Sequence, residues 1–109
     1  DAASRHAVVA DIMQHGRSFR GLSLANVDLH GEDLSGADFL NVDLSHANLT
    51  DAKLPGAEVQ GANLDGAIFA GAALEGVDLE SATLGSATCD AATHMPVGWR
   101  CSSGRPVGP

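Results

Sequence analysis

The sequence is poor in aromatic residues. Its 109 residues include no tyrosine, one tryptophan and three phenylalanines, so aromatics make up 4% of the chain. This excludes a core built mainly from large rings, although a hydrophobic content of 44% is enough to pack one. The remaining apolar residues are chiefly alanine, leucine and valine. We therefore expect a single domain with a narrow core.

Basic residues and long apolar runs are also scarce. Six Lys and Arg stand against 14 Asp and Glu, which gives a net charge of -8. Because proteins that bind nucleic-acid phosphates carry basic patches, direct binding to nucleic acid is not expected. No apolar run reaches the roughly 18 residues of a membrane span, and the start lacks the pattern of a signal peptide. These features predict no membrane association and a cytoplasmic location.

The sequence does contain a repeat of five residues. A large apolar residue, or Cys89, stands at every fifth position from Phe19 onward, and a small apolar residue precedes most of them by two positions. Only Arg17 and Glu32 interrupt the series of small residues. The residue between the two is mostly polar. The large positions are Phe19, Leu24, Leu29, Leu34, Phe39, Leu44, Leu49, Leu54, Val59, Leu64, Phe69, Leu74, Leu79, Leu84 and Cys89.

A period of five fits neither a helix nor an alternating strand, but it does fit a square coil. The small and large residues lie two positions apart, so both can face inward while the residue between them faces solvent. The other two residues turn a corner, where Gly or Asn tolerates a positive φ. Four corners close a coil of about 20 residues, and such coils would stack about 4.8 Å apart. The expected core includes Phe19, Leu24, Phe39, Leu44, Leu64, Phe69 and Leu84.

The repeat units resemble those of a known family. Residues 37–39, 47–49 and 62–64 read Ala-Asp-Phe, Ala-Asn-Leu and Ala-Asn-Leu, which is similar to the A(D/N)LXX signature of pentapeptide-repeat proteins. The resemblance spans residues 17–91. It implies an all-β solenoid, a right-handed quadrilateral β-helix of about four coils with a short N-terminal capping α-helix.

Both ends of such a solenoid need caps, because unpaired backbone groups would otherwise recruit other chains. Residues 1–16 predict a helix over the first coil, with Ser4 as N-cap and Gly16 as C-terminal stop. Its expected apolar stripe is Val8, Val9, Ile12 and Met13.

Residues 92–109 predict a C-terminal cap followed by a flexible tail. Thr93, Pro96 and Trp99 resemble the TxxPxG-aromatic ending of small family members. Residues 102–109 are rich in Ser, Gly and Pro, so we expect a mobile tail there.

The outward positions are strongly acidic. Between residues 21 and 90, twelve acids stand against one base, Lys53. Asp38, Glu58 and Asp78 would form one column, with Glu80 beside it, and these four residues are the candidate interaction face. The alternative is that outward positions are charged simply for solubility.

No group of polar residues converges as catalysis or metal binding requires, so we expect no catalytic residues, cofactor or metal. Among the carboxylates of the repeats, Glu32 alone takes an inward position, where it either meets the N-terminal cap or turns to solvent. Cys89 lies in the core series and Cys101 in the tail. A disulfide between them could pin the cap, but two free thiols are expected in the cytosol.

These features predict a non-catalytic protein-protein interaction or scaffold module with flat acidic faces and a protein partner, acting as a monomer or end-to-end dimer. A spacer within a longer protein stays open. The resemblance implies one alternative: bacterial quinolone-resistance members imitate DNA and modulate DNA gyrase or topoisomerase IV. Those rods are longer per chain and dimerise end to end.

Overall fold

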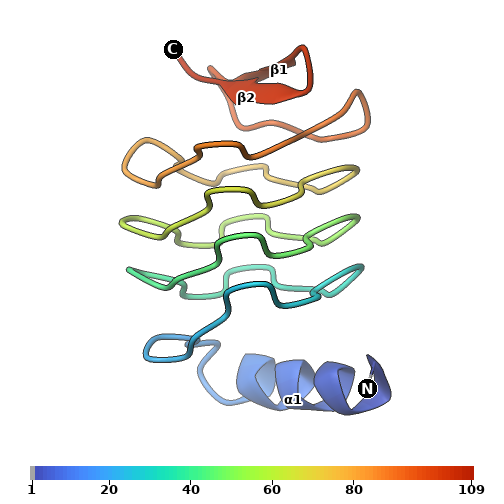
Figure 1. Ribbon diagram of the computed structural model, residues 1–109. Coiled ribbons are helices and arrows are strands. Elements are labelled where there is room, and N and C mark those ends of the chain that lie inside the picture. The colour runs from blue at the N-terminus through green and yellow to red at the C-terminus, as the bar shows by residue number, and fades with distance from the viewer. Residues whose placement is uncertain (1) are drawn as a thin grey trace.

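The computed structural model describes residues 2–109 and consists of a stack of coils closed at both ends. Helix α1 (Ala2–Gln14) lies at one end, and strands β1 (Arg100–Ser102) and β2 (Arg105–Val107) lie at the other (Figure 1). The whole chain measures 35 × 23 × 20 Å. The molecule is therefore a short rod whose ends are built from non-repetitive segments.

The coils are joined by parallel backbone pairing between residues twenty positions apart. Asp43 pairs with Asn63, for example. The Leu44 N–H donates to the Asn63 carbonyl at 2.8 Å, and the Asn63 N–H donates to the Val42 carbonyl at 3.0 Å. The twenty-residue coil predicted from the period of five is confirmed by this pairing.

Apolar side chains fill the inside of the coils. The Phe19 and Phe39 rings stack with their centroids 4.7 Å apart. Leu24 and Leu84 are only partly buried, because the first and last coils each lack a neighbouring coil on one side. The other expected core residues, Phe19, Phe39, Leu44, Leu64 and Phe69, are all buried.

One corner shows how glycine makes room for a side chain of the preceding coil. Asn41 and Gly61 occupy the same corner of successive coils, with φ of 60° and 72°. The Asn41 side chain lies where a Cβ on Gly61 would stand. Glycine at position 61 therefore leaves open the space that Asn41 fills.

Helix α1 caps the first coil through a narrow face. Val9 is buried, and Ile12 and Met13 pack against the core, but Val8 is 59% exposed. Val8 was wrongly assigned to the buried stripe, because neighbouring helical residues point about 100° apart and the contact is narrow. The helix begins at Ala2, so Ser4 lies inside it rather than at its N-cap.

The end of α1 has a capping geometry typical of helix C-termini. Gly16 has a φ of 102°, and the Arg17 N–H donates to the Ile12 carbonyl at 2.9 Å. This bond satisfies a carbonyl that the helix leaves unpaired. The chain can therefore turn directly from the helix into the first coil.

The C-terminal segment differs from the predicted mobile tail. Strands β1 and β2 pair antiparallel, and Cys101 is bonded to Cys89 in a disulfide with a Cα–Cα distance of 6.0 Å. The expectation of two free thiols is therefore wrong. The Cys89 N–H also donates to the Gly104 carbonyl at 3.0 Å. The hairpin is ordered because this bond and the disulfide fasten it to the last coil.

Thr93, Pro96 and Trp99 lie between the last coil and this hairpin. The Thr93 hydroxyl donates to the Phe69 carbonyl at 2.8 Å, and Pro96 is buried. The Trp99 N–H donates to the Pro96 carbonyl at 3.0 Å. A Cβ on Gly108 would come within 2.9 Å of the indole, so glycine lets the backbone lie directly against the ring.

Candidate functional site

The column of Asp38, Glu58 and Asp78 is only partly continuous. Asp38 and Glu58 are bridged neighbours. Across the described chain, however, no backbone hydrogen bond joins residues 57–60 to residues 77–80. The Gly61 N–H instead donates to the Ser81 hydroxyl at 3.3 Å. The backbone ladder on this side of the rod therefore ends at Glu58.

Asp38 is already neutralised within the molecule. The Arg20 Nε–H donates to Asp38 Oδ2 at 2.7 Å, and Asp38 Oδ1 accepts the Leu40 N–H at 3.0 Å. The Asp38 side chain is 19% exposed. Because charge pairing and exposure both limit what Asp38 offers a partner, it contributes little to an acidic face.

Glu58, Asp78 and Glu80 keep their charges free. All three residues are exposed, and none forms an ion pair anywhere in residues 2–109. Among the described residues, the only bond made by their side chains is local, from the Glu80 N–H to Asp78 Oδ1 at 3.0 Å. The unpaired negative charge of the candidate interaction face therefore lies toward the C-terminal end of the rod.

Asp78 and Glu80 also border a groove of about 340 Å³, which we call the C-terminal groove. Its other lining residues come from the coil wall and from the C-terminal segment: Gly76, Val77, Pro96, Val97, Trp99 and Pro109. The repeat pattern could not reveal this groove, because it depends on how residues 96–109 fold back. The resemblance at Thr93, Pro96 and Trp99 was the only signal in the sequence.

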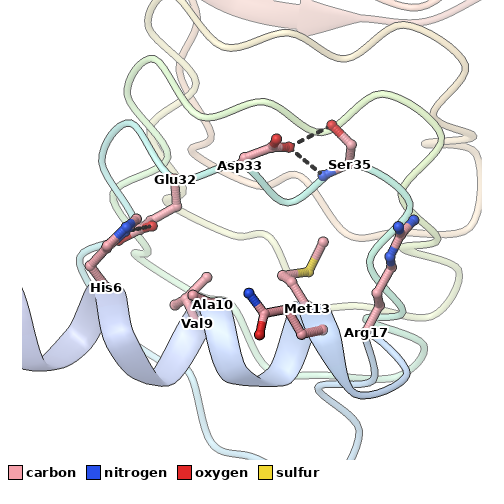
Figure 2. A pocket seen from close by; sticks show the side chains of 9 residues that line it. His6, Val9, Ala10, Met13, Arg17, Glu32, Asp33 and Ser35 are labelled. Atoms are coloured by element: carbon pink, nitrogen blue, oxygen red, sulfur yellow. Dashed lines mark hydrogen bonds and ion pairs between the residues drawn. The ribbon is translucent and has the colours of Figure 1, made fainter.

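A second pocket, of about 300 Å³, lies between α1 and the first coil (Figure 2). His6 Nδ1 lies 2.7 Å from Glu32 Oε1, and Glu32 is only 5% exposed. Of the two alternatives for Glu32, contact with the N-terminal cap is therefore the one observed. The other side chains of the pocket include Met13 and Arg17.

Four polar side chains of this pocket, those of His6, Glu32, Asp33 and Ser35, bind one another in pairs. Asp33 Oδ1 accepts the Ser35 hydroxyl at 2.7 Å and the Ser35 N–H at 3.1 Å. Both bonds hold the pKa of Asp33 below its ordinary value, and the bond from the Ser35 hydroxyl has the larger effect. Since His6 and Glu32 bind each other, the pocket serves mainly to hold the helix on the coil.

The N-terminal end also carries an apolar surface. Val8 and Leu22 are exposed there and line a depression of about 210 Å³ beside Val27 and Leu24. The depression exists because α1 crosses the coil without covering all of it.

The described part of the chain lacks two further features. No group of three or more His, Cys, Asp and Glu residues within residues 2–109 is arranged to hold a metal ion. None of the helices in this same range is long and apolar enough to cross a membrane.

Several solved structures resemble this chain. A pentapeptide repeat protein from the Arabidopsis thaliana thylakoid lumen is 28% identical, with 69% of this chain and 61% of that chain covered and a TM-score of 0.51. A pentapeptide repeat protein from Nostoc Pcc 7120 is 33% identical, with 86% and 87% covered and a TM-score of 0.42. This chain thus spans about three fifths of the thylakoid-lumen protein.

A trypsin-treated form of QnrB1, a plasmid-mediated fluoroquinolone resistance protein, is more distant. It is 20% identical, with 68% of this chain and 46% of that chain covered and a TM-score of 0.40. A search among curated proteins gives no match.

The family assignment rests on the repeats themselves. The sequence profile for pentapeptide repeats, described as eight copies, matches residues 18–51 and 43–80. The fold of that family is a right-handed quadrilateral β-helix, as the resemblance implied, and the stacked coils with their N-terminal helix agree with it. This chain therefore belongs to the pentapeptide repeat family.

Proposed function

We propose that the chain is a non-catalytic protein-binding or scaffold module that meets its partner through Glu58, Asp78 and Glu80. The observation that carries this proposal is that these three exposed carboxylates have no ion-pair partner within residues 2–109, whereas Asp38 is paired with Arg20. Pentapeptide repeat proteins are generally non-catalytic, which supports the same class of function.

The stack of coils suits such a role because it is pre-organised. Glu58 lies on a coil that is hydrogen-bonded to the preceding one through its own N–H and carbonyl. Little conformational entropy is lost when a partner docks on a surface held in this way. Complementary basic residues on the partner would speed association and set its orientation.

We propose that the module works as a monomer. Helix α1 packs on the first coil and the hairpin is fastened to the last coil, so a non-repetitive segment covers part of each end of the stack. Such caps hinder the stacking of two rods end to end. An end-to-end dimer is the alternative.

The disulfide favours an oxidising compartment as the place of action. Structural disulfides are rare in the cytosol of most organisms, where thiols are kept reduced. The Cys89–Cys101 bond therefore argues against the cytoplasmic location expected from the sequence. The thylakoid-lumen origin of one similar protein is consistent with this proposal.

Mimicry of DNA toward gyrase or topoisomerase IV is the second candidate, and the net charge of -8 favours it. It requires a long, regular series of negative charges, because a DNA duplex carries one about every 1.7 Å. Here Arg20 neutralises Asp38, and the backbone ladder ends at Glu58. We therefore rank mimicry below general protein binding.

Affinity capture with matched charge variants tests the proposal. Glu58→Lys/Glu80→Lys is compared with Asp11→Lys/Asp43→Lys, which changes the net charge equally at exposed sites elsewhere on the rod. We expect one partner that the wild type and the control retain and the first variant loses. Loss from both variants, or from neither, would contradict the proposal, and recovery of gyrase subunits would favour mimicry.

A further inference from the structure

We propose that the C-terminal groove binds an extended basic segment of a partner protein, with a Lys or Arg side chain placed against Asp78, Glu80 and the Trp99 indole. This inference rests on the proposed function, because it assigns the acidic face a location and a partner class. It commits to a peptide-like ligand with alternating basic and apolar side chains.

The lining of the groove matches the two parts of such a side chain. Val97 provides exposed apolar surface for the aliphatic stem of Lys or Arg, which packs readily on apolar walls. Val77 and Pro96 line the groove as well, although most of each residue is buried. Asp78 and Glu80 provide negative charge for the cationic head, since neither is used in an ion pair within residues 2–109. The indole of Trp99 adds the ring type that attracts cations best.

The backbone beside the groove departs from the regular ladder. On this side of the rod the ladder ends at Glu58, and neither the N–H nor the carbonyl of Asp78 has a hydrogen-bond partner within the described chain. The part of Asp78 that lines the groove and can meet a partner is therefore its carboxylate.

The groove is held in place by features that need no partner. Gly108 lies directly against the indole, and the backbone N–H of Trp99 donates to the Pro96 carbonyl. The disulfide fixes Cys101, two residues after Trp99, to Cys89. Val97 in the wall is fully exposed, so it contributes apolar surface to solvent without a fold-stabilising contact that would explain it. These contacts describe a pre-formed site with one unused apolar residue at its rim.

The single tryptophan makes a direct experiment possible. Because Trp99 is the only one in the chain, its fluorescence reports on the groove alone. The disulfide-intact protein is titrated with a capped hexapeptide of alternating arginine and valine, and separately with the glutamate and valine equivalent. We expect a saturable change with the basic peptide and none with the acidic one.

Neutral variants then locate the binding. Asp78→Asn/Glu80→Gln should weaken binding of the basic peptide by about tenfold, since it removes two charge-assisted contacts. The matched control, Asp11→Asn/Asp43→Asn, changes the net charge equally at exposed positions outside the groove lining and should leave affinity within about twofold. Val97→Lys, at a fully exposed position, should weaken binding through repulsion while leaving thermal unfolding unchanged.

The outcomes separate this inference from the function on which it rests. Equal weakening by both double variants, or equal binding of both peptides, overturns the groove as a specific site. So does self-association of the wild type that Asp78→Asn/Glu80→Gln abolishes, because the occupant would then be a second copy. If the peptide result is negative while Glu58→Lys alone still loses the captured partner, only the groove proposal fails, since Glu58 lies outside the groove lining.

Discussion

The two ends of the rod are closed by different means. At the N-terminal end, α1 is held by side-chain packing around Val9 and by one contact between the exposed His6 and the buried Glu32. At the C-terminal end, the hairpin is held covalently by the Cys89–Cys101 disulfide. The N-terminal closure therefore depends on the surface that its side chains bury. The C-terminal closure depends on a covalent bond that restricts the chain.

The difference follows from what each cap can bury. Helix α1 has 13 residues and satisfies most of its own backbone bonds, so one apolar stripe suffices to dock it. Strands β1 and β2 have three residues each, and an isolated hairpin of two strands is marginal in water. A short rod can therefore use a weak element as a cap when a covalent bond fixes it.

The coils between the two caps provide the reference for the stability of both ends. Leu64→Ala removes a buried side chain from a coil that is paired on both sides, so we expect a loss of about 2–5 kcal/mol in the free energy of unfolding. Leu24→Ala, in the half-covered first coil, should cost clearly less. Denaturant unfolding of both variants measures the contrast, and equal losses would show that the first coil is as well packed as the middle.

The disulfide is the next largest effect. Its cysteines are 12 positions apart in the sequence, and closing a loop of this size in the unfolded chain contributes about 3 kcal/mol. We expect Cys89→Ser/Cys101→Ser to lose about that much and to expose residues 100–107 to amide hydrogen exchange. Residues 2–14 should exchange as in the wild type. Faster exchange at both ends would mean that the caps are coupled through the coils between them.

The repeat could be predicted from the sequence because each unit repeats the same physical requirement. Leu44 and Leu64 meet identical surroundings in successive coils, so fifteen positions carry one signal. The hairpin occurs once, and nothing in the composition of residues 102–109 distinguishes it from a mobile tail. Its order depends on a bond between Cys89 and Cys101, whose formation the sequence left open.

The candidate site was predictable only in its charge. The outward register placed Asp38, Glu58 and Asp78 on one side of the rod, and the bridge between Asp38 and Glu58 agrees with that placement. The pairing of Arg20 with Asp38 was hidden, because Arg20 occupies a corner position whose direction the period does not fix. The C-terminal groove was hidden too, since Trp99 reaches Asp78 only after the chain folds back.

A smaller effect tests the helical closure by itself. Val9→Ala removes two buried methyl groups beneath α1, so we expect a loss of about 1.5 kcal/mol and faster exchange confined to residues 2–14. Val8→Ala is the matched control, because Val8 is exposed on the same helix and should cost less than about 0.5 kcal/mol. If both variants cost the same, the helix would be docked by a different face from the one described.

The smallest expected effect is a loss of stability at acidic pH. The Gly71 N–H donates to Asp90 Oδ1 at 3.1 Å, and this bond, with those from Ala92 and Thr93, holds the pKa of Asp90 below its ordinary 3.8. Because the pKa is lower in the folded state, the carboxylate contributes its full stabilisation at pH values above its unfolded-state pKa. That stabilisation is lost as the pH falls through the lower, folded-state pKa. Thermal unfolding of wild type and Asp90→Asn is followed from about pH 6 to about pH 2.5.

The Asp90 variant should be less stable at the higher pH, and the difference should disappear in acid. Because Asp90 borders the last coil and Asp33 the first, Asp33→Asn gives the matching measurement at the helical end, where Ser35 lowers the pKa. A constant difference across the whole pH range would show that the Asp90 carboxylate charge plays no part. In that case the hydrogen bond from Gly71 would act as an ordinary neutral one, and closure of the C-terminal end would rest on the disulfide and the packing of Trp99.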